Sequence, residues 1–142
     1  FYIGRGMDWA LAMEASLKLK EISYIFSEAY AAGELKHGTI ALIEPGTLVV
    51  ALLTQSALLD KTRSNIKEVR ARGASVLCVQ RESAGKADAD IADKTWLIPD
   101  APDLLMPMLA VIPMQLLAYY MAVSKGCDVD KPRNLAKSVT VE

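Results

Sequence analysis

Three charged residues recur at helical spacing early in the sequence: Glu14, Lys18 and Glu21. At about 100° per residue they fall within roughly 60° of one another on a helix surface. Apolar residues occupy or border the same arc, namely Ala10, Leu11, Leu17, Ile22 and Ile25. The spacing therefore predicts charges inside a buried stripe, where isolated charges are costly. Two carboxylates beside an ammonium could hold one acid ionised and leave the other free to move a proton. The alternative is a solvated ion pair that contributes a few tenths of a kcal/mol.

Two more side chains have a possible chemical role, His37 and Lys137. His37 is the only histidine and lies in a polar, glycine-bounded segment, as either a surface residue or a catalyst. The two cysteines, Cys78 and Cys127, are far apart in the sequence, so we expect no metal site and no metal cofactor. Lys137, near the C-terminus, is either an exposed lysine or an amine whose pKa is lowered by desolvation. Such an amine can form a Schiff base with a carbonyl substrate.

A short glycine motif, Gly4-Arg5-Gly6, follows the first predicted strand. Glycines in this place let a pyrophosphate approach a helix N-terminus. The third glycine position of the dinucleotide-binding motif is occupied by Trp9, whose ring would block close packing of helix and strand. We therefore interpret the motif as a tight turn between strand and helix, and expect no nucleotide cofactor.

The composition is that of one compact domain. The chain has 142 residues, 52% of them hydrophobic, and a net charge of −1, which gives no strong attraction to nucleic acid or to an anionic membrane. The low cysteine content suits a reducing cytosol, so we expect a cytoplasmic location. The sequence starts without an initiator Met or a signal peptide, and we expect it to be a piece of a longer protein.

Alternating strand and helix patterns run through most of the chain. Strands are predicted over residues 1–3, 48–53, 75–80 and 94–98, and helices over residues 8–25, 59–69 and 104–123, with Asp8 as the cap of the first helix. We expect residues 82–93 to be a solvent-facing connection. Residues 104–123 carry no charge and are long enough to cross a bilayer, but Pro107, Pro113 and Gln115 favour a helix buried in the core or a subunit interface. The alternation predicts an α/β fold with a parallel sheet and helices on both faces.

Residues 14–25, residues 28–38 and the terminus 128–142 closely resemble the glucosamine-6-phosphate synthases, the family of glutamine:fructose-6-phosphate aminotransferases. The resemblance covers the second of two sugar isomerase (SIS) subdomains in the C-terminal half of that family. It implies a doubly wound, three-layer sandwich in which helices flank a five-stranded parallel sheet. Residues 1–127 would form the SIS subdomain, and residues 128–142 a tail that closes over the active site.

The resemblance also implies roles for the residues singled out above. Glu21 would be the base that moves a proton between C1 and C2 of the sugar, supported by Glu14 and Lys18. Lys137 would form an imine with the sugar carbonyl, beside a substrate-contacting Ala136. His37 would assist ring opening and reach the site from the other subunit of a homodimer.

The implied partners are a sugar phosphate, a glutaminase domain that supplies ammonia, and the first SIS subdomain. The substrate would be fructose 6-phosphate and the product glucosamine 6-phosphate, with no cofactor. The sequence departs from the family pattern at Phe26, where many members have histidine, and at Thr39, where proline is usual. Residues 54–56 (Thr-Gln-Ser) after a strand are either a degenerate phosphate loop or a helix cap.

Two other functions remain open. One is a non-catalytic SIS module that senses a sugar phosphate, and the other is an isomerase or deaminase of amino-sugar phosphates. The first would need the phosphate loop but not the charged residues, and the second would lack an upstream glutaminase domain. For the main interpretation we expect the 142-residue chain alone to have little or no activity.

Overall fold

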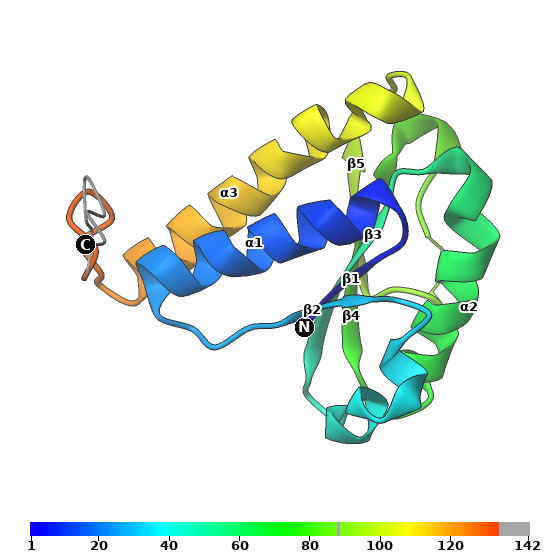
Figure 1. Ribbon diagram of the computed structural model, residues 1–142, viewed down its shortest axis with the longest axis horizontal. Helices are drawn as coiled ribbons and strands as arrows, with labels where there is room; N and C mark the ends of the chain where they lie inside the picture. The colour runs from blue at the N-terminus through cyan, green and yellow to red at the C-terminus, as the bar shows by residue number, and fades with distance from the viewer. Residues whose placement is uncertain (88, 134–142) are drawn as a thin grey trace, which may run out of the picture.

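The computed structural model describes residues 1–87 and 89–133 and contains one parallel sheet. Its strands follow the order β2-β1-β3-β4-β5. In chain order they are β1 (Tyr2–Gly4), β2 (Ala29–Ala31), β3 (Leu48–Leu53), β4 (Ser75–Arg81) and β5 (Lys94–Ile98). Helices α1 (Met7–Ser23) and α3 (Met106–Ser124) cover one face of the sheet, and α2 (Leu59–Arg70) covers the other (Figure 1). The predicted fold, a three-layer α/β sandwich around a five-stranded parallel sheet, is confirmed.

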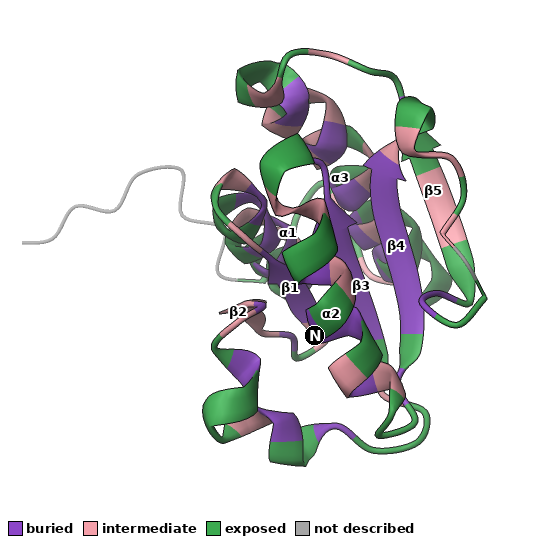
Figure 2. Ribbon diagram, turned by 90° about the vertical axis from the view of Figure 1, so that its right-hand side faces the viewer, coloured by how far each residue is buried: buried purple, intermediate pink, exposed green. Residues whose placement is uncertain are grey.

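The two central strands form the interior of the molecule. Strands β3 and β4 are buried along most of their length (Figure 2), as expected for parallel strands covered on both faces. Their side chains point alternately to the two faces of the sheet and belong to two apolar clusters, one on each face. Val49 and Ala51 face Ile66 and Val69 of α2, while Leu52 belongs to the cluster under the other two helices. The continuous apolar runs in the sequence arise from this double coverage.

Small residues make the contact between α1 and α3. The inner side of α3 repeats every four residues, through Met106, Ala110, Met114, Ala118 and Ala122. The facing side of α1 has Ala12 and Ala15, both fully buried. Because the alanines on both helices are short, α1 and α3 can lie close together (Figure 1).

The outer side of α3 is also apolar. The helical segment Asp103–Ser124 has a mean hydropathy of 1.6 and is long enough to cross a membrane, a criterion that core helices of soluble proteins also satisfy. Here its inner side is part of the core, and large side chains on its outer side are exposed, among them Met108, Ile112, Leu116 and Tyr120. A second apolar side is therefore left uncovered by the rest of the described chain.

Several short elements were not evident in the sequence pattern. Strand β2 and the 3-10 turns η1 (Leu35–His37) and η2 (Thr39–Leu42) lie between α1 and β3. The segment 82–93 was expected to face solvent throughout, and this expectation is wrong for Ile91 and Ala92, which are buried. Both belong to the apolar cluster under α2, where they close the core before β5 begins.

Asp8 does not cap α1, contrary to the sequence prediction. The helix begins at Met7, the cap position is Gly6, and Asp8 lies in the first helical turn. A Cβ on Gly4 would lie 2.5 Å from the backbone of Asp8, so only glycine allows α1 to begin this close to β1. The buried Asp8 carboxylate accepts hydrogen bonds from the backbone N–H groups of Thr54, at 2.7 Å, and Gln55, at 3.3 Å, and from the Thr54 hydroxyl.

This carboxylate occupies the position where doubly wound folds usually bind ligands. Strands β1 and β3 are neighbours in the sheet, and their connections leave in opposite directions, which makes a crevice at their carboxyl ends. The loop after β3 also contacts a second carboxylate, that of Asp103. The backbone N–H and the hydroxyl of Ser56 donate hydrogen bonds to it at 3.3 and 2.8 Å. Residues 54–56 are thus neither a helix cap nor an open phosphate loop in this structure.

Replacing Leu52 by alanine tests the double coverage of β3. Leu52 is fully buried, so Leu52→Ala should lower the free energy of unfolding by about 2–5 kcal/mol through lost burial and a cavity. Leu48→Ala in the same strand is the matched control, because Leu48 is half-exposed and should cost less than about 1 kcal/mol. Chemical denaturation measures both, and equal losses would contradict the assigned core.

Two substitutions of Asp8 separate its hydrogen bonds from its charge. Asp8→Ala leaves the donors of Thr54 and Gln55 unpaired and should cost about 3 kcal/mol. Asp8→Asn keeps an acceptor for both N–H groups and can donate to the Thr54 hydroxyl, so it should cost much less.

The difference in free energy of unfolding between the wild type and Asp8→Asn should change with pH in one direction. Burial raises the pKa of the Asp8 carboxyl, although the hydrogen bonds from Thr54 and Gln55 and the charge of Arg81 oppose this. The folded state therefore binds the proton more tightly than the unfolded state. The wild type should lose stability relative to Asp8→Asn as the pH rises above about 4. Denaturation at several pH values measures the difference, and a gain with rising pH would refute the assignment.

Candidate active site

The three charged residues predicted to act together do meet on α1. The Lys18 ammonium donates a hydrogen bond to the Glu21 carboxylate at 2.7 Å, and its nitrogen lies 3.6 Å from a carboxylate oxygen of Glu14. One cation thus lies between two anions on adjacent turns of the helix. The spacing seen in the sequence produces this cluster directly.

The cluster does not lie in the buried stripe of α1, and this part of the prediction is wrong. The side chains of Glu14, Lys18 and Glu21 keep 43%, 34% and 46% of their surface exposed. The buried side of the helix is formed by Asp8, Leu11, Ala12, Ala15, Ser16, Leu19 and Ser23. Two apolar residues of the predicted stripe, Ala10 and Leu17, are exposed, and they made the outer side resemble a core stripe in the sequence.

The electrostatics of the cluster keep Lys18 charged. The hydrogen bond to Glu21 raises the pKa of the Lys18 ammonium, and the nearby Glu14 adds to this against a smaller effect of burial. A protonated amine has no free electron pair for attack on a carbonyl carbon. Lys18 is therefore suited to hold and neutralise carboxylates, and any imine-forming amine must come from elsewhere.

The chain after α3 returns to the C-terminal end of α1, next to this cluster. Lys125 donates a hydrogen bond to the carbonyl of Ser23 at 2.6 Å. The backbone N–H of Arg133 donates to the Tyr24 hydroxyl at 2.7 Å, and its guanidinium lies 4.5 Å from the centre of the Tyr24 ring. Neither Tyr24 nor Arg133 stood out as a candidate site residue in the sequence. Tyr24 directly follows α1, but nothing in the sequence pattern connects it with a residue 109 positions away.

The other predicted site residues lie apart from the cluster or outside the described residues. His37 is exposed at the end of η1, with its Nε2 atom 4.0 Å from Glu34. Figure 1 places η1 and η2, drawn in cyan, well away from the last turn of α1. Ala136 and Lys137 fall outside the described residues, so their predicted roles stay predictions.

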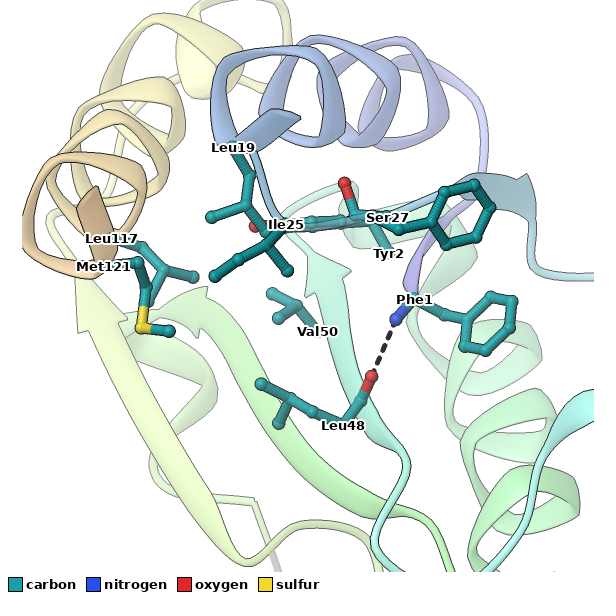
Figure 3. A pocket seen from close by; sticks show the side chains of 10 residues that line it. Phe1, Tyr2, Leu19, Ile25, Ser27, Leu48, Val50, Leu117 and Met121 are labelled. Carbon is teal, nitrogen blue, oxygen red and sulfur yellow. Dashed lines mark hydrogen bonds between the residues drawn. The ribbon is translucent and has the colours of Figure 1, made fainter. Parts of the chain in front are cut away.

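A small apolar pocket lies near the amino ends of β1 and β3 rather than at the charged cluster. Its volume is about 130 Å³, and its lining comes from α1, α3, these strands and the loop after α1, including Leu19, Val50 and Leu117 (Figure 3). None of the side chains that line it is charged. The N-terminal amino group of Phe1 lies at this pocket and donates a hydrogen bond to the Leu48 carbonyl at 2.7 Å. Among the described residues, no group of three or more metal-ligating side chains comes together.

Comparison with known proteins relates this geometry to one family of sequences. The SIS domain family matches residues 1–125. The chain is 65% identical over its whole length to a glutamine-fructose-6-phosphate aminotransferase (isomerizing) of Caldanaerobacter subterraneus subsp. tengcongensis, and 64% identical to that of Clostridium acetobutylicum. It spans 23% of the length of each of these curated relatives. The resemblance noted in the sequence is thereby confirmed.

Solved structures agree with these matches. The C-terminal domain of glucosamine-fructose-6-phosphate aminotransferase from Francisella tularensis matches 92% of this chain at a TM-score of 0.86 and 41% identity, over 36% of its own length. A glucosamine-6-phosphate deaminase from Thermotoga maritima matches 99% of this chain at a TM-score of 0.72 and 31% identity, over 40% of its own length. With the doubly wound fold and the match over residues 1–125, this chain belongs to the SIS domain family.

Proposed function

We propose that this chain is the part of a longer aminotransferase that carries out proton transfer and imine formation on a sugar phosphate. The reaction would convert fructose 6-phosphate and ammonia from glutamine to glucosamine 6-phosphate. The observation that carries the proposal is the cluster of Glu14, Lys18 and Glu21 in a chain 65% identical to a named aminotransferase of this kind.

In this mechanism each member of the cluster has a distinct task. Glu21 acts as the base that moves a proton between C1 and C2, because a carboxylate can take up and return a proton at one position. Lys18 holds Glu21 in place through the 2.7 Å hydrogen bond, and Glu14 fixes Lys18 from the other side. Lys137 supplies the amine that Lys18 cannot, and Ala136 contacts the sugar beside it.

The site needs parts beyond this chain. Proton transfer between carbon atoms benefits from exclusion of water, but the cluster is half-exposed. The usual phosphate position at the ends of β1 and β3 is filled by the Asp8 carboxylate, so the phosphate of the sugar must be held elsewhere. A first SIS subdomain could supply both the cover and the phosphate site, and a glutaminase domain could supply ammonia.

A cytoplasmic homodimer is the assembly that fits this proposal. The segment η1, which ends at His37, lies away from the last turn of α1 in its own chain (Figure 1), which supports a role for His37 at the site of a second subunit. The exposed apolar sides of α1 and α3, with Met13, Leu17, Met108 and Ile112, support packing against protein rather than a role on a free surface.

A second candidate is an amino-sugar-phosphate deaminase or isomerase. The glucosamine-6-phosphate deaminase from Thermotoga maritima, 31% identical over nearly the whole chain, favours keeping it. The two candidates differ in their nitrogen source. Glutamine-dependent synthesis of glucosamine 6-phosphate by the full-length protein would support the aminotransferase, and release of ammonia from glucosamine 6-phosphate without glutamine would support the deaminase.

Glu21→Gln in the full-length protein tests the proposed base. The amide keeps the size of the side chain but cannot take up a proton, so synthesis should fall by about 10²- to 10⁴-fold. Binding of fructose 6-phosphate, followed by calorimetry, should change little. Glu44→Gln, at an exposed position in the turn before β3, should keep wild-type activity. Full activity of Glu21→Gln would rule out Glu21 as the base.

The 142-residue chain alone should make little or no glucosamine 6-phosphate from fructose 6-phosphate and ammonia, because residues 1–87 and 89–133 provide neither an open phosphate site nor a cover for the cluster. A coupled assay for glucosamine 6-phosphate with ammonium salts as the nitrogen source measures this. Appreciable synthesis would show that the other subdomain is dispensable.

A further inference from the structure

The side chain of Arg5, in the middle of the Gly4-Arg5-Gly6 motif, joins separate parts of the fold. Arg5 directly follows β1, and its Nε donates a hydrogen bond to the side-chain oxygen of Asn65 in α2 at 3.0 Å. Asn65 is buried, and its amide nitrogen donates to the Glu68 carboxylate at 3.4 Å, which leaves the amide oxygen for Arg5. A fixed, neutral acceptor therefore holds one end of the guanidinium.

The other end of the guanidinium lies against Gly33. A Cβ built on Gly33 would overlap a terminal guanidinium nitrogen of Arg5 and lie 3.0 Å from its Cζ. Gly33 does not have a positive φ, so its backbone conformation is open to other residues. The need for glycine at this position is therefore one of space, because a side chain there would have to displace the guanidinium.

This contact lies at the start of the segment that carries His37. The N–H of Ala32 donates to the carbonyl of Gly4 at 2.8 Å, which joins the segment to the end of β1. The turn then continues into η1, where the N–H of His37 donates to the carbonyl of Glu34 at 3.0 Å. Leu35 is buried in the core, but the His37 side chain keeps 63% of its surface exposed. The guanidinium contact thus fixes the turn from which the imidazole projects.

We propose that Arg5 is a positioning residue for His37. By filling the space over Gly33, its guanidinium sets the direction in which η1 presents the imidazole to the site of a second subunit. The inference rests on the proposed function, because it takes ring opening of the sugar as the task of His37. In this role Arg5 acts through the backbone of the turn, without contact to the sugar.

Ring opening is the step that depends on such positioning. In the cyclic form of fructose 6-phosphate the oxygen on C5 is bonded to C2. When the ring opens, this bond breaks and its electron pair goes to the C5 oxygen, which takes up a proton. The hydroxyl on C2 loses its proton and becomes the carbonyl. An imidazole can carry the proton between the two oxygens only if it is correctly placed.

A substrate that cannot form a ring separates positioning of His37 from a general structural defect. 5-Deoxyfructose 6-phosphate has no hydroxyl on C5, so it stays an open-chain ketone and needs no ring opening. The test measures kcat/KM of the full-length protein for this compound and for fructose 6-phosphate. The ratio of the two values reports the ring-opening step.

Two variants disturb the contact from opposite sides. Arg5→Ala removes the guanidinium, and Gly33→Ala displaces it but keeps the charge. Each should lower kcat/KM for fructose 6-phosphate by about tenfold, because a small misplacement of a catalytic group is costly. Each should leave kcat/KM for the open-chain substrate within about twofold of wild type. His37→Ala should show the same selectivity with a loss of about 100-fold.

Further variants test whether Arg5 and Gly33 act through one contact. In Arg5→Ala/Gly33→Ala the added methyl group has room, so the loss should equal that of Arg5→Ala instead of the product of both losses. Arg5→Lys keeps the charge but not the planar guanidinium and should resemble Arg5→Ala. Arg72→Ala is the matched control, because it removes the same charge at an exposed position after α2. It should keep the wild-type ratio.

Hydrogen exchange gives a readout that needs no substrate. The amides of Glu34 and His37 should exchange faster in Arg5→Ala and Gly33→Ala than in the wild type, because both are bonded within this turn. Equal losses on both substrates, wild-type exchange, or multiplied losses in the double variant would overturn the inference. Wild-type kcat/KM of His37→Ala for fructose 6-phosphate would instead overturn the proposed role of His37, and with it the positioning role of Arg5.

Discussion

The close approach of helix α1 to strand β1 sets the positions of most other groups in this fold. Gly4 leaves no side chain between the strand and the first helical turn, so the backbone of Asp8 can lie directly against it. That approach turns the Asp8 carboxylate inward toward the end of β3 and the side of α1 with Ala12 and Ala15 toward α3. The remaining sides of the helix, including Glu14, Lys18 and Glu21, must then face outward.

The same constraint separates the crevice between β1 and β3 from the charged cluster on α1. In a doubly wound sheet the crevice between β1 and β3 is the natural place for an anionic ligand, because backbone N–H groups converge there. Here the donors of residues 54–56 are already paired with Asp8 and Asp103. The charged cluster of Glu14, Lys18 and Glu21 lies farther along α1, on its outer surface.

The sequence predicted the strands and helices well, because their patterns are local. The apolar run of β3 and the helical spacing of the charged cluster needed only neighbouring residues to be recognised. The burial of that cluster was predicted wrongly, because Ala10 and Leu17 on the outer side look the same in sequence as core residues. Asp8 was assigned as a cap because the true partners, Thr54 and Gln55, are more than forty residues away. Tyr24 gave no signal at all, since its backbone conformation and its contact with Arg133 exist only in the folded chain.

The outer side of α3 affects how this domain can exist before assembly. Helix α3 has two apolar sides. The outer side carries Met108, Ile112, Leu116 and Tyr120, and the inner side carries Met106, Ala110 and Met114. Folding of the domain buries only the side chains on the inner side. If the domain folds during synthesis before anything covers the outer side of α3, this apolar surface stays exposed to water. Other unfolded chains can then bind to it and aggregate. Rapid burial of the outer side of α3 is then as necessary for a stable, non-aggregated protein as correct folding of the sheet.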